Sequence, residues 1–208
     1  LCVPSVGHEE AALLQQCIDD NFVSSVGPFV TDFERSFAEF VGVEHAVATS
    51  SGTAALHVAM VVNGIGPGDL VAVSDFTFIA SANAVRYTGA DVLLVDSELE
   101  TWNLDGDLLY DAVNKLAAHG QRIPTAIEVA HILGQPARLE PLLALRDEFG
   151  IRLIEDAAEA LGASYRSGSL ADRQVGTVGA AGCFSFNGNK VMTTGSGGML
   201  VTNSADAA

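Results

Sequence analysis

The feature that most constrains the fold of this chain is a series of short apolar runs separated by segments with helical patterns. Each run has the length of one strand, and its apolar residues are continuous, which is typical of strands buried on both faces of a sheet. The runs cover residues 45–50, 70–74, 91–96, 125–131, 151–156, 183–186 and 198–203. Their alternation with helices predicts an α/β fold with a mostly parallel central sheet of about seven strands and helices on both faces.

The segments between the runs have the apolar spacing of helices. They cover residues 53–62, 79–87, 104–119 and 140–149, and Gly150 follows the last of them as a helix C-cap would. Residues 9–20 and 31–40 resemble two amphipathic helices, and the stretch between them, 21–30, has little helical character. We therefore predict an N-terminal helical segment over residues 1–44 and a larger α/β domain over 45–208. Because the last run is followed by no further element, we expect the sequence to be a fragment.

Composition and charge argue against several classes of protein. The net charge is −16 and the ten Lys and Arg residues are scattered, so a nucleic-acid backbone is not an expected partner. We find no apolar run long enough to span a bilayer and no basic region followed by an apolar one at the start, so we expect a cytoplasmic protein without membrane contact. The three cysteines and five histidines lack the spacing of metal ligands, and we expect no metal site.

Candidate ligand-binding residues follow several of the apolar runs, at the sheet edge where open α/β folds gather their ligands. The first group is "TSSGTAAL", residues 49–56. The amides of Gly52 and Thr53 at a helix N-terminus, together with the Thr53 hydroxyl, would form a phosphate cradle. The alternative is a tight strand-to-helix turn capped by Ser or Thr. The glycine-rich "GIGPGD" at 64–69 precedes a strand, and we interpret it as a helix stop and turn.

The second group is "IRLIEDAAEALGA", in which Glu155 and Asp156 end a strictly apolar run. A carboxylate at this place either caps a following helix or binds a cationic group. Glu159, three residues later, is either the reciprocal half of a capping box or a second polar contact to the same ligand.

The third group centres on Lys190, one of only two lysines in the chain, between an apolar run and a glycine-rich turn. An ammonium group near apolar segments loses solvation, which makes a free amine available as a nucleophile or Schiff-base partner. The alternative is a surface lysine on a loop. Taken together, a phosphate cradle, a carboxylate able to hold a protonated ring nitrogen and an imine-forming amine are the three anchors that a pyridoxal phosphate site requires.

These groups lie in motifs that resemble the DegT-type sugar aminotransferases, pyridoxal-phosphate enzymes of aminotransferase fold type I. The motifs are "VSSVGPFVTDFE", "ATSSGTAALHVA", "DFTFIASANAV", "TWNLD", "IEDAAEALGA" and "FSFNGNKVMTTGSGGM". The resemblance covers essentially the whole chain and implies a three-layer large domain that binds pyridoxal 5'-phosphate. It also implies that the smaller C-terminal domain of this family is absent from these 208 residues.

The resemblance assigns roles to individual residues. Lys190 would be the catalytic residue, which forms an imine with the cofactor and then moves a proton between cofactor and substrate. Asp156 would pair with the protonated pyridine nitrogen. Gly52, Thr53 and Ser185 would hold the phosphate.

Further contacts follow from the same resemblance. Phe78 would stack on the pyridine ring, and Glu159 would lie near the ring hydroxyl, where the family often has Gln or His. His131 matches a histidine common near the family's active site, although a buried structural histidine is an equal alternative. Lys190 favours transamination, because related enzymes that dehydrate deoxysugars carry histidine in its place.

The motifs look most like those of enzymes that act on UDP-linked 4-keto-6-deoxy-N-acetylhexosamines, with glutamate as the amino donor. The resemblance also implies a homodimer in which the neighbouring subunit completes the active site. The alternatives are another keto sugar, dehydration by the same fold, or a non-catalytic relative that keeps the fold.

Overall fold

The strands of this chain form one sheet in the computed structural model, which describes residues 3–24 and 27–208. The strands are β1 His45–Thr49, β2 Leu70–Ser74, β3 Asp91–Val95, β4 Ala126–Ala130, β5 Arg152–Asp156, β6 Ala181–Ser185 and β7 Gly198–Thr202. Their order across the sheet is β1-β7-β6-β5-β4-β2-β3. β7 runs antiparallel to both of its neighbours, and the other pairs are parallel, so the predicted mostly parallel sheet of seven strands is confirmed.

Six α-helices of the described chain connect or precede these strands. They are α1 His8–Asp19, α2 Pro28–Val41, α3 Gly52–Val62, α4 Ala80–Tyr87, α5 Gly106–Ala118 and α6 Glu140–Phe149. α2 begins at Pro28, three residues before the predicted start, because proline has a backbone angle suited to the first turn and its missing N–H needs no partner there. The prediction that residues 28–30 are non-helical is therefore wrong. Ser25 and Val26 of the same stretch lie outside the described residues, as does Cys2.

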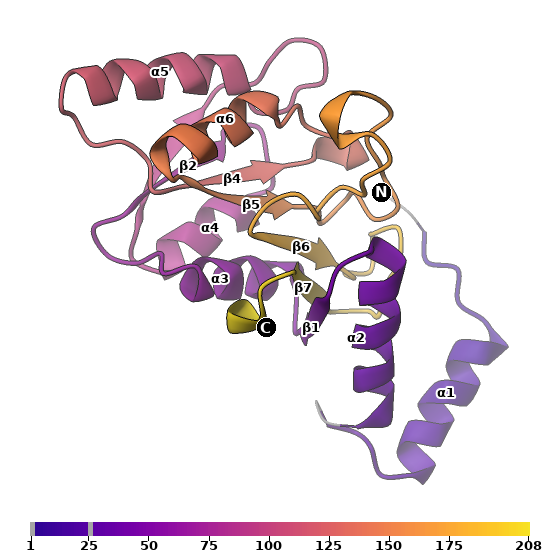
Figure 1. Ribbon diagram of the computed structural model, residues 1–208. Helices are drawn as coiled ribbons and strands as arrows, with labels where there is room; N and C mark the ends of the chain where they lie inside the picture. The colour runs from indigo at the N-terminus through magenta and orange to yellow at the C-terminus, as the bar shows by residue number, and fades with distance from the viewer. Residues whose placement is uncertain (1–2, 25–26) are drawn as a thin grey trace.

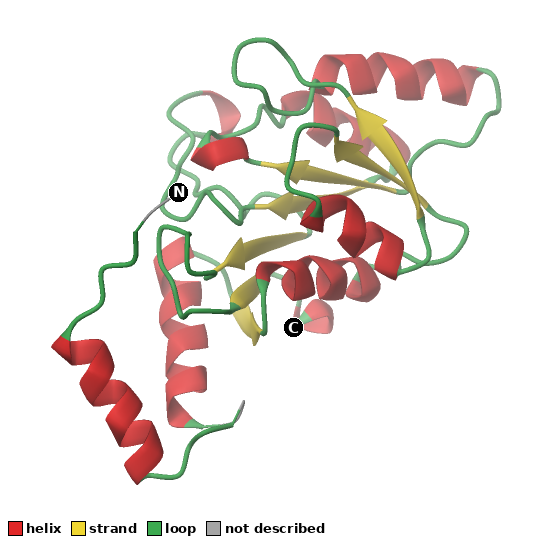
Figure 2. Ribbon diagram, turned by 180° about the vertical axis from the view of Figure 1, so that it is seen from behind, coloured by secondary structure: helices red, strands yellow, loops and turns green. Residues whose placement is uncertain are grey.

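Helices cover the sheet on both faces (Figures 1 and 2). α3 and α4 pack on one face, where Leu56 and Val85 join a cluster with Ile154 of β5. α5 and α6 pack on the other face, where Leu109 and Leu142 meet Leu153 of the same strand. Successive residues of β5 thus enter opposite cores, which explains why its apolar residues are continuous in sequence.

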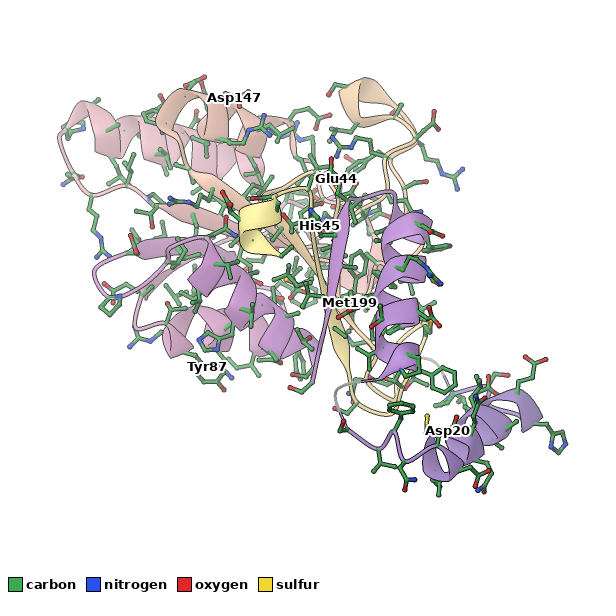
Figure 3. All side chains as sticks on the ribbon, turned by 60° about the horizontal axis from the view of Figure 1, so that its bottom comes forward. Asp20, Glu44, His45, Tyr87, Asp147 and Met199 are labelled. Atoms are coloured by element: carbon green, nitrogen blue, oxygen red, sulfur yellow. The ribbon has the colours of Figure 1, made fainter. Side chains whose placement is uncertain are left out.

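α2 packs on the part of the sheet formed by β6 and β7. Phe37 of α2 lies edge-on to Phe184 and Phe186, with ring centroids 5.1 and 5.5 Å away. α1 behaves differently, because it buries none of its residues and projects from the rest of the molecule (Figures 1 and 3). Within the described residues, none of the helices has the length and apolar character needed to cross a membrane.

The topology determines where a ligand can bind. β4, β5 and β6 are adjacent and parallel, so the segments that follow them meet at one edge of the sheet. The N-termini of α3 and α4 lie at the same edge, since both helices follow strands that run in the same direction.

Candidate active site

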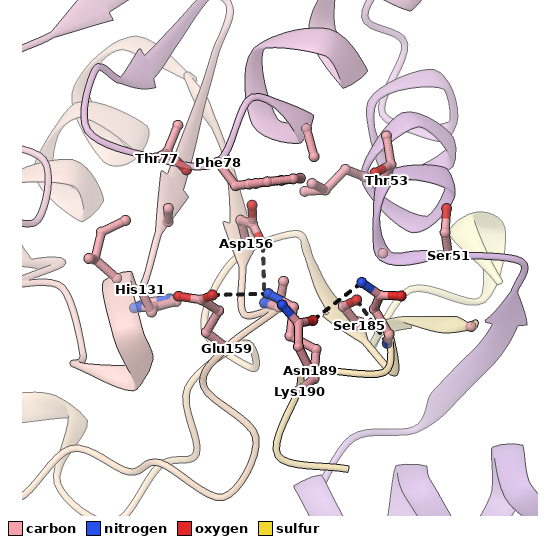
Figure 4. Close-up of a pocket in the computed structure, with 18 of the residues that line it drawn as sticks. Ser51, Thr53, Thr77, Phe78, His131, Asp156, Glu159, Ser185, Asn189 and Lys190 are labelled. Carbon is pink, nitrogen blue, oxygen red and sulfur yellow. Dashed lines mark hydrogen bonds and ion pairs between the residues drawn. The ribbon is translucent and has the colours of Figure 1, made fainter. Parts of the chain in front are cut away.

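A cavity of about 550 Å³ opens at the carboxyl ends of β4, β5 and β6 (Figure 4). Every residue that the sequence assigned to the cofactor lines it, although these residues come from four separate segments of the chain. They are Gly52, Thr53, Phe78, Asp156, Glu159, Ser185 and Lys190. His131 lines the same cavity.

The first wall of the cavity is the turn between β1 and α3. Ser51 is the N-cap of α3, and its hydroxyl oxygen accepts a hydrogen bond of 3.1 Å from the amide of Ala54. Gly52 and Thr53 occupy the first turn, where amides have no partner within the helix. Both interpretations of "TSSGTAAL" are therefore compatible: Ser51 caps the helix, and the next two residues face the cavity.

Gly52 is required by the close approach of α3 to β6. A Cβ atom at this position would lie 2.7 Å from the Cβ of Ser185, closer than real Cβ contacts come. The absence of a side chain at Gly52 therefore brings the helix N-terminus and Ser185 to the same end of the cavity. An anion bound there would meet the positive end of the α3 dipole.

The floor of the cavity is formed by Asp156 at the end of β5, which is almost fully buried. Its Oδ2 accepts a hydrogen bond of 2.9 Å from the Ser81 hydroxyl, and its Oδ1 accepts one of 3.1 Å from the amide of Ala158. Burial raises the pKa of Asp156, and these two donors oppose the rise. The chain after β5 continues as turns and not as a helix, so the helix-cap and capping-box interpretations of Asp156 and Glu159 are wrong.

Lys190 reaches the cavity from the loop after β6. Its Nζ donates to Oε1 of Glu159 at 3.0 Å, and Oε2 of Glu159 accepts from the amide of Leu133 at 3.1 Å. The Lys190 side chain is only 14% exposed, so it is not a free surface lysine. Figure 4 shows Lys190 and Glu159 pointing toward one another beside Asp156.

Glu155 faces the other side of the sheet from Asp156 and takes part in a buried hydrogen-bond network. Its oxygens accept from Nε2 of His131 at 3.1 Å and from the amides of Gly176, Val178 and Gly179. Burial acts to raise the pKa of Glu155, but His131 and the amides outweigh it, so the pKa of Glu155 is lowered. Within this network Glu155 holds the loop before β6 against the sheet.

His131 links this network to the cavity wall. The amide of Ala137 donates to its Nδ1 at 3.0 Å, which leaves Nε2 to carry the hydrogen that bonds Glu155. His131 is therefore a buried, hydrogen-bonded histidine, in agreement with the structural alternative, and its ring also lines the cavity.

Sequence reasoning missed several polar residues around the cavity. Thr77 and Ser196 line it, and Ser81 holds its floor. The Ser196 hydroxyl donates to the carbonyl of Ser50 at 2.9 Å and so ties the loop that follows Lys190 to the turn before α3. For Ser81 the available signal is a small polar residue in the first turn of a helix. Within the described residues, no three His, Cys, Asp or Glu side chains form a group that could hold a metal ion.

Comparison with known protein families identifies the family of this chain. The model of the DegT/DnrJ/EryC1/StrS aminotransferase family matches residues 4–208. The chain belongs to this aminotransferase family. The family expected from the sequence motifs is thus confirmed.

Curated relatives agree with this assignment. The chain is 43% identical over 208 residues to GDP-perosamine synthase of Caulobacter vibrioides. This match covers 100% of the chain and 53% of that synthase. It is 39% identical over 203 residues to the putative pyridoxal phosphate-dependent aminotransferase EpsN of Bacillus subtilis, covering 98% of the chain and 51% of EpsN. This family member therefore spans about half the length of the curated relatives that it matches.

Solved structures confirm the fold of this family member. The aminotransferase from Psychrobacter cryohalolentis is 33% identical and superposes with a TM-score of 0.87 over 100% of the chain and 50% of that structure. An aminotransferase of the same family from Brucella abortus is 31% identical, with a TM-score of 0.87 over 95% of the chain and 52% of that structure. The predicted aminotransferase fold is confirmed.

Proposed function

We propose that this chain is the cofactor-binding part of a pyridoxal-phosphate-dependent aminotransferase that transfers an amino group from glutamate to a nucleotide-linked keto sugar. The observation that carries the proposal is the convergence of Lys190, Asp156 and the Gly52–Thr53 turn on one cavity, from parts of the chain that are far apart in sequence. Family membership supports the reaction class.

The residues of the cavity fit the cofactor at each of its three functional ends. The N-terminus of α3 offers a cradle that a Cβ at Gly52 would fill, as a phosphate requires. Asp156 offers a buried acceptor, already oriented by two donors, for a protonated ring nitrogen. Lys190 offers the amine. When bound, pyridoxal phosphate supplies a carbonyl that accepts an amino group and a ring that takes up the electron pair of the reacting carbon.

Asp156 acts by orientation and charge. Its Oδ2 and Oδ1 are held by Ser81 and Ala158, so the carboxylate cannot rotate freely when a ring binds above it. The pKa of Asp156 is raised by burial, and a cationic ring nitrogen beside it would favour the carboxylate anion again. The negative charge of Asp156 would in turn keep the ring nitrogen protonated.

Lys190 acts by holding and moving a proton at Nζ. Its contact with Glu159 is that of an ammonium group with a carboxylate, and an ammonium group must lose a proton before it can act as nucleophile or base. Glu159 is in hydrogen-bond contact with Nζ and is itself fixed by the amide of Leu133, so it is placed to receive this proton. Retention of Lys190 favours transamination over dehydration.

Phe78 and Ser185 complete the proposed site. The Phe78 side chain lines the cavity and remains 74% exposed, so an aromatic face is available to a ring that enters. Ser185 lies against Gly52 at the phosphate end.

The sequence motifs and the names of the relatives favour different nucleotides for the sugar substrate. The sequence motifs favour a UDP-linked 4-keto-6-deoxy-N-acetylhexosamine. The names of relatives favour a GDP-linked sugar instead, because matches from Caulobacter vibrioides, Escherichia coli O157:H7 and Vibrio cholerae are all GDP-perosamine synthases. We therefore propose a nucleotide-linked keto sugar as the substrate class and treat the two nucleotides as competing outcomes.

The experiment is amine transfer from ¹⁵N-glutamate by the full-length protein, offered a UDP-linked or a GDP-linked 4-keto-6-deoxy sugar in parallel. Appearance of ¹⁵N in one nucleotide sugar, detected by mass spectrometry, supports the proposal and identifies the nucleotide. If the protein retains the cofactor and neither sugar gains ¹⁵N, the keto-sugar assignment is wrong. Loss of the sugar hydroxyl without amination would indicate dehydration.

We also propose that the active protein is a homodimer, as the sequence motifs imply. Two surfaces support this: α1 exposes Leu13, Leu14 and Ile18 without burying any residue, and Trp102 and Leu133 stand exposed at a second hollow of about 660 Å³. Exposed apolar groups of this extent are typical of protein interfaces. The cytoplasmic location and the boundary between residues 44 and 45 stay predictions.

A further inference from the structure

Glu128 is a fully buried acidic residue that the proposed reaction does not use. It lies in the middle of β4, and neither of its carboxyl oxygens has a hydrogen-bond partner in the described part of the chain. An ionised carboxylate without a partner is strongly unfavourable in such surroundings, whereas a neutral carboxylic acid is tolerated far better. The position therefore favours the protonated form of Glu128.

The side chain of Glu128 lies on the same face of the sheet as Asp156. Glu128 is paired in register with Ile154 of β5, and Asp156 is two residues further along that strand. This face is covered by apolar side chains of α3 and α4, among them Leu56 and Val85. The two carboxyl groups thus share one poorly solvated layer directly below the cavity.

Ser81 of α4 is close to both acids, since it bonds Asp156 and acts on the pKa of Glu128. Its hydroxyl donates to Asp156, so in the 2.9 Å pair with Thr77 the Ser81 oxygen is the acceptor. A hydroxyl oxygen has two lone pairs, and one remains for a proton carried by Glu128. A neutral Glu128 can therefore donate toward Ser81, while an ionised Glu128 would have to compete with Asp156 for the single Ser81 proton.

The electrostatic surroundings of Glu128 also favour its protonated form. Burial raises the pKa of Glu128 well above its usual range, the charge of Asp156 adds to the rise, and the Ser81 hydroxyl opposes it. On β6, the Cys183 thiol lies on the same face, and burial raises its pKa well above the usual range as well. Asp156 has two donors and Glu128 has none, so one negative charge in this layer belongs to Asp156.

We propose that Glu128 is a positioning residue of the pocket floor: it holds the proton of a buried acid pair, bonds Ser81 and so keeps Asp156 as the single oriented anion below the cavity. The part of this inference that concerns the cofactor rests on the proposed function. The part that concerns the proton on Glu128 does not, and it can be tested without cofactor.

The cofactor-free test is a stability measurement across pH. A group whose pKa is raised on folding stabilises the protein fully below its unfolded pKa, and this stability is lost as the pH rises toward and through its folded pKa. Glutamine resembles the neutral acid but does not titrate. The ratio of the unfolding constants of wild type and Glu128→Gln should therefore grow by up to about tenfold per pH unit above pH ~5, until Glu128 ionises in the folded protein.

The measurement is denaturant unfolding of the full-length apoprotein between pH 5 and 8.5, where the pH values are chosen to lie above the ordinary Glu pKa of about 4.3. Ser74→Ala is the matched control, because Ser74 is equally buried and unpartnered but lies on the neighbouring strand, on the opposite face from Glu128. The unfolding free energy of Ser74→Ala should change with pH in the same way as that of wild type. If Glu128→Gln folds poorly, Glu128→Met takes its place, because methionine has a similar length and does not titrate. The unfolding constant of Glu128→Met should then differ from that of wild type with pH in the way expected for Glu128→Gln. Curves parallel to wild type for Glu128→Gln and Glu128→Met, or failure of both variants to fold, would overturn the inference.

The cofactor readout is the absorbance of bound pyridoxal phosphate as a function of pH. A neutral Glu128 adds no charge near the ring nitrogen, and glutamine is equally neutral. The pH at which the absorbance of the bound cofactor changes should therefore be the same in Glu128→Gln, in Ser74→Ala and in wild type. A change at lower pH in Glu128→Gln than in wild type would mean that Glu128 carries a negative charge beside the ring, and would overturn the inference. If the protein binds no cofactor at all, the proposed function fails, while the stability measurement still decides the protonation of Glu128.

Discussion

Asp156 shows how one side chain acquires a role from neighbours that are distant in the sequence. The carboxylate is buried at the end of β5, and the donor to its Oδ2 is Ser81, 75 residues earlier in the chain. These contacts orient the group before any ligand arrives. A preoriented anion loses little freedom on binding, so its charge is used efficiently.

Replacing Asp156 by asparagine should weaken pyridoxal phosphate binding while leaving the fold intact. The amide has nearly the same shape but cannot offer a negative charge to a protonated ring nitrogen. Because hydrogen bonds to charged groups contribute about 1.5–3 kcal/mol, we expect the dissociation constant to rise by roughly 10- to 100-fold. Titration of the apoprotein with cofactor, followed by absorbance, measures this. Unchanged affinity would remove Asp156 from the site.

Lys190, Asp156 and Glu159 could be predicted because they sit in short contiguous motifs. Ser81 could not be assigned a role from the sequence, since a serine in a first helical turn commonly serves only as a local cap. Glu128 was equally hidden, because the run that contains it has the pattern of an ordinary buried strand. Its significance depends on the register between β4 and β5, which the sequence does not specify.

At the scale of elements, the approach of α3 to β6 determines the phosphate end of the cavity. The two elements are far apart in sequence and touch through Gly52 and Ser185. The strands themselves could be predicted because each is an apolar run bounded by turns. The turns after β5 could not, because "DAAEALGA" has a helical composition, whereas its two carboxylates bond Ser81 and Lys190, which are distant in sequence.

Gly52→Ala should lower both stability and cofactor affinity. The added methyl group would lie 2.7 Å from the Cβ of Ser185, so α3 and β6 must separate. We expect a loss of roughly 1–3 kcal/mol in unfolding free energy, as for overpacked cores, and weaker binding of the phosphate end. Gly66→Ala is the control, because a Cβ there meets no atom within 4 Å. Equal behaviour of the two variants in denaturant unfolding and cofactor titration would contradict this account of the cradle.

At the scale of the whole molecule, several of the apolar side chains that the described chain leaves exposed lie on α1 and beside the cavity. Leu14 is 66% exposed on a helix that buries nothing of its own. A second copy of the protein that covers α1 would explain both observations. Sequence periodicity identified α1 as amphipathic but gave no information on what its apolar side faces.

Leu14→Glu should weaken self-association of the full-length protein. Burial of a leucine side chain contributes about 1.5–3 kcal/mol, so its replacement by a charged group should raise the dimer dissociation constant by about tenfold or more. Sedimentation velocity over a concentration series measures this, and Gln15→Glu is a control that adds charge at a polar position of the same helix. If Leu14→Glu and wild type associate equally, α1 does not form the dimer interface.

The most direct test of the account is to locate the cofactor on the chain. The full-length protein is loaded with pyridoxal phosphate, treated with borohydride to convert a reversible lysine adduct into a stable amine, digested and analysed by mass spectrometry. We predict that the modification lies on Lys190 and not on Lys115, and that Lys190→Ala carries none within this part of the chain. Modification of another lysine, or none at Lys190 in the loaded protein, would contradict the central claim that Lys190 is the catalytic amine.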